Sequence, residues 1–324
     1  MHRRSLCSLL AALLALPAVL GAAEPRPKAP TTLAEARRLA DRTDAALIGT
    51  EAQGGVVSVY QHAWLNNAVG VAFDGFGTTE MIYFHEPTNS VRPLASGIWR
   101  VAVDDPSQAE PVRYTKLGGL DVDGGTVRPG DGAIFAADFN GNNDVIDDNI
   151  YLFDRDGDTI AFWETDRGLA GPPCSGPAID QIVDLAYDPV DPTRLYATNF
   201  GDNKIYSVVL TDTAGGTTAP SGCIVDAVFD PPAGFGNVAS IEFDPCNQGY
   251  WLTDFDSSQV ALVAGPASFD TVVSSFTTEA PSSFNSGIAV QVRPDRRPLL
   301  WQVDLNDQVT YVLRSGLDRC PAGM

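Results

Sequence analysis

Short apolar segments alternate with polar turns along most of the chain. The segments are rich in Val, Ile, Phe, Tyr and Trp, and Gly, Pro, Asn and Asp separate them. This pattern is typical of β-strands joined by turns. Helical patterning is confined to a segment near the N-terminus, where Thr32 and Glu35 match a capping box and predict a short helix over residues 31–46. We therefore expect one all-β domain over residues 50–320.

The strand segments form a repeat of about 50 residues. One element reads V-A-F-D at 71–74, L-A-Y-D-P at 185–189, I-E-F-D-P at 241–245 and V-Q-V-R-P at 290–294, with Arg293 in the fourth position of the last copy. A second element ends on a polar residue, and a third follows a polar turn. Units of three or four strands with this period predict a β-propeller.

The repeats predict five blades, with six as the alternative. The last unit ends after its third strand, near Arg314, and the strand at 56–60 has no unit of its own. We expect this N-terminal strand to supply the outer strand of the last blade. Closing the ring in this way limits exposed sheet edges.

The segment 195–206 reads L-Y-A-T-N-F-G-D-N-K-I-Y and resembles the repeat core of the NHL, YVTN and gluconolactonase-like propellers. Residues 134–151 and 250–260 are more divergent copies, and the resemblance covers most of residues 70–313. It specifies an architecture rather than a reaction. One function that it implies is a divalent-metal-dependent hydrolase of lactones or other esters, since gluconolactonase-like enzymes hold an ion near the axis with a Glu, two Asn and an Asp. By position, the catalytic candidates are Glu242, Asn199, Asn285 and Asp254.

The segment from Asp138 to Asn149 carries oxygen side chains at alternating positions, which suits calcium, a cation that takes six to eight oxygen ligands. Its start, D-F-N-G, resembles the calcium loops of FG-GAP and dockerin-type repeats. The candidate ligands are Asp138, Asn140, Asn142, Asp144, Asp147 and Asp148. The alternative is a long polar turn whose Asn and Asp side chains bond their own backbone.

The N-terminus predicts export. Residues 1–23 combine two arginines, an apolar run and small residues at 21–23, which is typical of a signal peptide, and the Pro-rich segment 24–30 reads as a linker. No later apolar run is long enough to span a membrane, so we expect no membrane insertion. The net charge of −20 argues against nucleic acid as a partner. We expect a secreted or periplasmic protein.

Four cysteines remain beyond the expected signal peptide, an even number that suits disulfides in an oxidising compartment. Three pairings are possible, and we expect Cys174–Cys223 and Cys246–Cys320, because each would join neighbouring blades. A zinc site is disfavoured because the spacings contain no close pair.

A polar residue recurs at one position of the repeat, at Asp138, Asn199, Asp254 and Asp304, and these should share one face of the ring. Convergent oxygens there could hold a cation, but a hydrogen bond to the following turn, repeated in each blade, is the favoured explanation. We therefore expect a monomeric, exported binding or scaffold propeller, stabilised by calcium, with a protein or small-molecule ligand. The lactone or ester hydrolase is the alternative, and the sequence leaves open whether the chain is an enzyme.

Overall fold

The computed structural model describes most of the repeat region. The described residues are 53–61, 68–74, 80–85, 97–102, 109–112, 122–139, 149–165, 174–211, 222–278, 285–292, 297–305, 309–317 and 320. The expected signal peptide (1–23), linker (24–30) and helix (31–46) lie outside them.

The described strands form five antiparallel sheets of four strands each. The first contains β2 (Ala68–Asp74), β3 (Glu80–His85), β4 (Gly97–Ala102) and β5 (Ala109–Val112). The second contains β6 (Val122–Val127), β7 (Ile134–Asp138), β8 (Asn149–Phe153) and β9 (Thr159–Glu164). The third contains β10 (Ile182–Tyr187), β11 (Arg194–Asn199), β12 (Lys204–Leu210) and β13 (Cys223–Phe229). The fourth contains β14 (Val238–Asp244), β15 (Gly249–Asp254), β16 (Gln259–Val263) and β17 (Val272–Thr277). The fifth contains β18 (Asn285–Gln291), β19 (Leu299–Asp304), β20 (Val309–Arg314) and β1 (Val56–Gln61).

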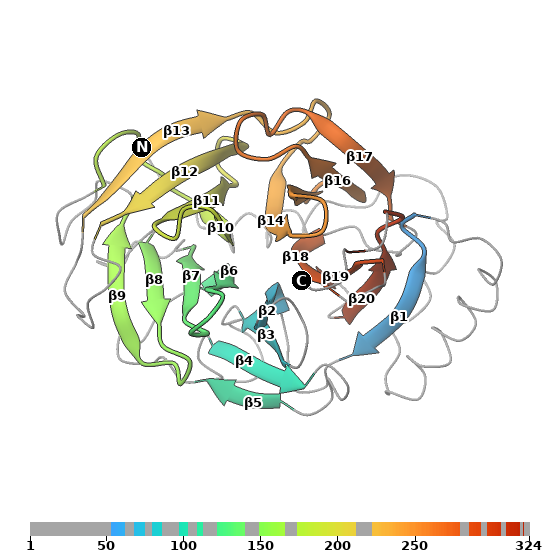
Figure 1. Cartoon of the computed structure of the whole chain (residues 1–324), viewed down its shortest axis with the longest axis horizontal. Helices are drawn as coiled ribbons and strands as arrows, with labels where there is room; N and C mark the ends of the chain where they lie inside the picture. Colours follow the sequence, from blue (N-terminus) through green and yellow to red (C-terminus); the bar gives the residue numbers. More distant parts are fainter. Residues whose placement is uncertain are drawn as a thin grey trace, which may run out of the picture.

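The sheets stand around a common axis as the blades of a propeller (Figure 1). The first strand of four sheets and β18 of the fifth are innermost, and each inner strand contacts the inner strands of both neighbouring blades. β1 pairs antiparallel with β20, with Tyr60 opposite Thr310, so the N-terminal strand completes the last blade in the position that the sequence analysis gives it.

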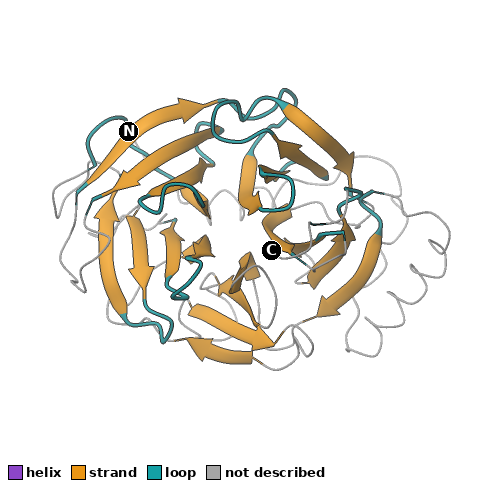
Figure 2. Cartoon of the chain, viewed as in Figure 1, coloured by secondary structure: helices purple, strands orange, loops and turns teal. Residues whose placement is uncertain are grey.

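The fold-class prediction, a propeller of five or six blades preceded by a helix, needs correction. The described residues contain strands and no helix (Figure 2), and they form no sixth sheet. The described residues therefore form an all-β propeller of four-stranded sheets, with neither a helix nor a sixth blade among them. Within the described part of the chain, no helix could cross a membrane.

The recurring Asp-Pro of the repeat stabilises the turn that follows an inner strand. The Asp188 carboxylate accepts hydrogen bonds from the Val190 amide at 2.8 Å and from the Tyr196 hydroxyl at 3.0 Å. Asp244 repeats this arrangement, because its carboxylate accepts a bond from Trp251 Nε1 at 2.9 Å. One side chain thus closes a tight turn and fixes an aromatic ring of the next strand.

In the last blade, the structure shifts the alignment of the repeat that the sequence predicts. Gln291 lies opposite Leu299 at the end of β18, as Asp244 lies opposite Gly249 at the end of β14. Gln291 also accepts a hydrogen bond from Trp301 Nε1 at 3.1 Å. The residue equivalent to Asp244 is therefore Gln291 and not Arg293.

Both predicted disulfides are confirmed. Cys174, which follows β9, is bonded to Cys223 in β13, and Cys246, in the turn after β14, is bonded to Cys320 beyond β20. Each bond joins neighbouring blades across a sequence separation of 49 or 74 residues. Such cross-links restrict the unfolded chain and are typical of oxidising environments. Between the blades lie apolar clusters, in which the largest fully buried side chains include Trp163, Trp251 and Trp301.

Candidate functional site: an axial pocket beside a narrow waist

The inner strands come closest together near their starts. Each carries a β-bulge there, and the residue that follows the bulge is small in four strands and Asp in the fifth. We call this level the waist; its residues are Gly70, Gly124, Asp184, Ser240 and Gly287.

Backbone contact between blades explains the glycines of the waist. A Cβ atom on Gly70 would lie 2.7 Å from the Cα of Gly124, and one on Gly287 would lie 2.8 Å from the Cα of Gly70. A Cβ atom on Gly124 would lie 2.5 Å from the Val183 carbonyl oxygen. No ordinary side chain fits at these positions, so the axis is narrow at the waist.

Asp184 completes the waist by hydrogen bonding to both neighbouring inner strands. Its carboxylate accepts bonds from the Ser240 hydroxyl, the Ile241 amide at 3.1 Å and the Leu185 amide at 2.9 Å, and from the Gly125 backbone. Burial raises the pKa of Asp184 to about 7, against the opposing effect of these bonds. The Ser240 hydroxyl in turn accepts a bond from the Ile288 amide at 2.9 Å, which continues the network to β18.

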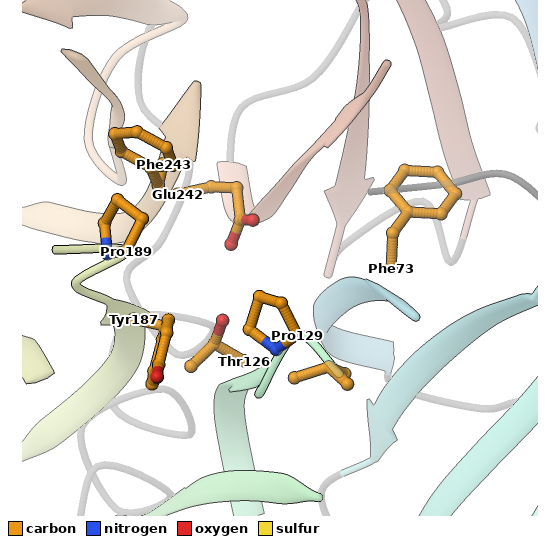
Figure 3. Close-up of a pocket in the computed structure, with 8 residues that line it drawn as sticks. Phe73, Thr126, Pro129, Tyr187, Pro189, Glu242 and Phe243 are labelled. Carbon is orange, nitrogen blue, oxygen red and sulfur yellow. The ribbon is translucent and has the colours of Figure 1, made fainter. Parts of the chain in front are cut away.

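Glu242 lies two residues after Ser240 on β14, and its side chain therefore leaves the strand on the same side. It lines a small pocket that is open to solvent near the ends of the inner strands. Figure 3 shows the Glu242 carboxylate pointing toward the middle of the lining residues, with Pro129 and Thr126 to one side and Phe73 across from it. We call this space the axial pocket.

The Glu242 side chain is largely buried, and its carboxyl faces the axial pocket. Its residue is 9% exposed, and none of the described residues donates to it. Burial raises its pKa well above the usual range, and the nearby carboxylates of Asp184 and Asp244 raise it further. A buried carboxyl without a donor is costly, and such groups are normally paired.

The walls of the axial pocket are aromatic rings and prolines held by turns. Besides Glu242, the lining residues are Phe73, Thr126, Val127, Pro129, Tyr187, Pro189 and Phe243. In the turn after β6, Arg128 Nε bonds Asp131 Oδ1 at 3.0 Å, and the same oxygen accepts the Ala133 amide at 3.2 Å. These bonds fix the turn that carries Pro129, as the Asp188 bonds fix the turn that carries Pro189. The pocket is thus largely pre-formed.

The structure does not bring Glu242 together with the other three catalytic candidates. Asn199 lies opposite Ile182, Asp254 opposite Val238, and Asn285 opposite Asp304, all at the starts of inner strands. Glu242 is four residues beyond Val238, or about 13 Å along the strand. The waist lies between the two levels.

The polar residues level with the starts of the inner strands form hydrogen bonds with turns and loops. The Asp254 carboxylate accepts the amides of Gly236 and Asn237 at 3.0 and 2.8 Å, and also the Ser257 hydroxyl. Asn199 Oδ1 accepts the Gly201 amide at 2.7 Å, and Asn285 Nδ2 donates to the Ser257 carbonyl at 3.1 Å. These contacts agree with the turn-stabilising explanation of the repeat.

Asp138 and Asp304 occupy the register position of Asn199 and Asp254, opposite Val122 and Asn285. Asp138 is buried at the end of β7. The other candidate calcium ligands, Asn140, Asn142, Asp144, Asp147 and Asp148, lie outside the described residues. Within the described ranges, no three His, Cys, Asp or Glu side chains are placed to hold a metal.

Sequence reasoning missed Asp184 and the waist. A signal was present in three units, because Gly70, Asp184 and Ser240 directly precede the V-A-F-D-type element, and the structure adds Gly124 and Gly287 at the same level. Small residues repeated at one position indicate close backbone approach.

No protein-family model matches the sequence, and no curated protein is significantly similar to it. Solved structures are similar in fold. They include the Cps50 (Swd1) β-propeller domain of Myceliophteria thermophila (10% identity, TM-score 0.39, covering 81% of this chain and 70% of that one). The Dos1 propeller is another, with 11% identity and a TM-score of 0.41, covering 79% of this chain and 74% of that one. A third is a protein of unknown function from Bacteroides caccae, with 10% identity and a TM-score of 0.42, covering 76% of this chain and 81% of that one. At this identity, the similarity concerns the β-propeller fold alone.

Proposed function

We propose that this chain is an exported, monomeric propeller that binds a ligand in the axial pocket. One observation carries the proposal: Glu242 is buried at a pre-formed, aromatic-lined pocket, and none of the described residues donates to its carboxyl. Concave, mostly apolar sites with few polar groups are typical of ligand pockets. The ligand is a small molecule or a side chain of a partner protein.

Export is part of the proposal. Residues 1–23 have the pattern of a signal peptide, and the two disulfides fit an oxidising compartment. We also propose that the chain is related to the NHL and YVTN propellers. A further part of the proposal is that residues 138–148 bind calcium, which would stabilise the second blade.

The register of the inner strands favours binding over the hydrolase alternative. A gluconolactonase-like centre needs four ligands around one ion, whereas Glu242 lies about 13 Å along the strand from the level of Asp254 and Asn199. Those two side chains already accept hydrogen bonds from turns. A metal-dependent hydrolase of this type therefore has less support than a binding pocket.

Filling the pocket tests the proposal. Pro189 lines the pocket, whereas its neighbour Val190 is 87% exposed and does not. Fragments that bind the mature protein in ligand-observed NMR should lose binding in Pro189→Trp and keep it in the matched Val190→Trp variant. Equal binding by both variants and the parent protein, with melting temperatures preserved, would place the ligand site elsewhere and refute the proposal.

A further inference from the structure

We infer that the axial pocket recognises an alkylammonium group, such as the side-chain end of a lysine or a small primary amine, with the nitrogen against the Glu242 carboxylate. This inference rests on the proposed function and names the chemistry of its ligand. Three features of the pocket support it: the charge around Glu242, the hydrogen bonds of its neighbours, and the walls.

The ionisable groups that act on Glu242 are acidic. Asp184 on β10 and Asp244 on the same strand are the charged groups that act on its carboxyl, and no described cation offsets them. Arg128, in the turn that carries Pro129, is paired with Asp131. Once these carboxyls are ionised, they repel an anionic ligand, and a cation relieves the repulsion between them.

The two neighbouring carboxyls are already saturated with donors. Asp184 accepts four hydrogen bonds within the waist. Asp244 accepts the Cys246 amide at 2.8 Å, the Asn247 amide at 3.1 Å and side chain at 2.8 Å, and Trp251 Nε1. Glu242 is the one carboxyl of the three to which no described residue donates. A ligand with N–H donors supplies what the carboxyl lacks.

The walls suit a cation on an alkyl stem. Phe73, Tyr187 and Phe243 offer aromatic surface, which attracts ammonium groups and packs against methylene groups. A hard metal ion needs six to eight oxygen ligands, whereas the side chains of the lining offer only the Glu242 carboxyl and the hydroxyls of Thr126 and Tyr187. The chemistry thus favours an organic cation over a metal.

Affinity should depend on pH in a defined direction. The titratable groups around Glu242 are Asp184, Tyr187 and Asp244, with Tyr250 on β15 and Arg128 in the turn after β6 beyond them. An ammonium group binds the ionised carboxylate, and a primary amine stays protonated up to about pH 10. Affinity should therefore rise with pH through the raised pKa of Glu242. A neutral ligand that accepts a bond from protonated Glu242 would show the opposite trend.

The test uses n-butylammonium, with n-butanol and butyrate as neutral and anionic analogues, titrated into the disulfide-intact mature protein by calorimetry and NMR. We expect butylammonium to bind at least tenfold more tightly than either analogue. Glu242→Gln should weaken its binding at least tenfold. Asp156→Asn, which removes one charge from the exposed turn after β8, should change it less than twofold.

The results separate the inference from the proposed function. Equal binding of butanol and butylammonium, or equal loss in Glu242→Gln and Asp156→Asn, would overturn the ammonium assignment. If other fragments still bind in a manner sensitive to Pro189→Trp, the pocket remains a binding site and only its ligand chemistry is wrong. The pH series on the parent protein decides the question even if Glu242→Gln fails to fold.

Discussion

Asp184 and Glu242 are two buried carboxyls on neighbouring inner strands, and their surroundings differ. Asp184 receives four hydrogen bonds at the waist, whereas no described residue donates to Glu242 in the axial pocket. In both, burial raises the pKa. The comparison teaches that burial alone does not distinguish a carboxyl that holds the fold from one that serves a ligand. The number of hydrogen-bond donors around the carboxyl distinguishes the two cases.

The two levels also differ in what fills the space between blades. At the waist, backbone meets backbone through Gly70, Gly124 and Gly287. At the axial pocket, the side chains of Phe73, Tyr187 and Phe243 stand between the strands and leave room among them. The first arrangement tolerates no added atom, and the second can exchange contacts with a ligand.

The largest loss of stability should come from adding a methyl group at the waist. Gly124→Ala places a Cβ atom 2.4 Å from the Asp184 carboxylate and 2.5 Å from the Val183 carbonyl oxygen, so the inner strands must separate. We expect a loss of about 3 kcal/mol or more in the free energy of unfolding, measured by denaturant titration. Gly130→Ala is the control. It meets no atom within 4 Å, and only its φ of +108° should cost about 1 kcal/mol. Similar losses in both variants would show that the waist is not tightly packed.

The second prediction concerns the contribution of Asp184 to the pH dependence of the protein's stability. Its pKa is about 7 in the folded protein and near 3.8 when unfolded, so the folded state holds a proton that the unfolded state releases between these values. Its contribution to stability is fully present below about pH 4 and is lost as the pH rises to about 7. The stability of the parent protein relative to Asp184→Asn should therefore fall across this window and level off above it. A difference that is constant from pH 4 to 8 would contradict the raised pKa.

The smallest effect is expected at Glu242. Glu242→Gln removes a carboxyl to which no described residue donates, so the variant should match the parent near pH 4 and be more stable at pH 9, by about 1 kcal/mol or more. Thermal unfolding at both pH values measures this. Asp156→Asn, at an exposed position, should leave the melting temperature unchanged. If Glu242→Gln destabilises the protein as much as changes at the waist do, Glu242 belongs to the fold rather than to a binding site.

The repeat made the strands, the placement of the N-terminal strand and the disulfide pairs predictable, because strand periodicity and turn residues are local signals. Which residues of different blades contact one another was not predictable from these local signals. Glu242 alternates with Ile241 and Phe243 and so resembles an ordinary surface residue of a strand, but an inner strand is covered on both faces. Equivalent repeat positions also do not imply proximity, as the separation of Glu242 from Asn199, Asp254 and Asn285 shows.

The fifth blade joins the first and the last described strands in one sheet, since β1 pairs with β20. During synthesis, β20 emerges long after β1, so the edge that β1 completes cannot form until nearly every other blade has been made. Folding therefore finishes with a contact of very high sequence separation, which slows the final step. The Cys246–Cys320 bond then fastens the late segment to the preceding blade. A fragment that lacks either end would present an open strand edge to other chains, which makes truncation a route to aggregation.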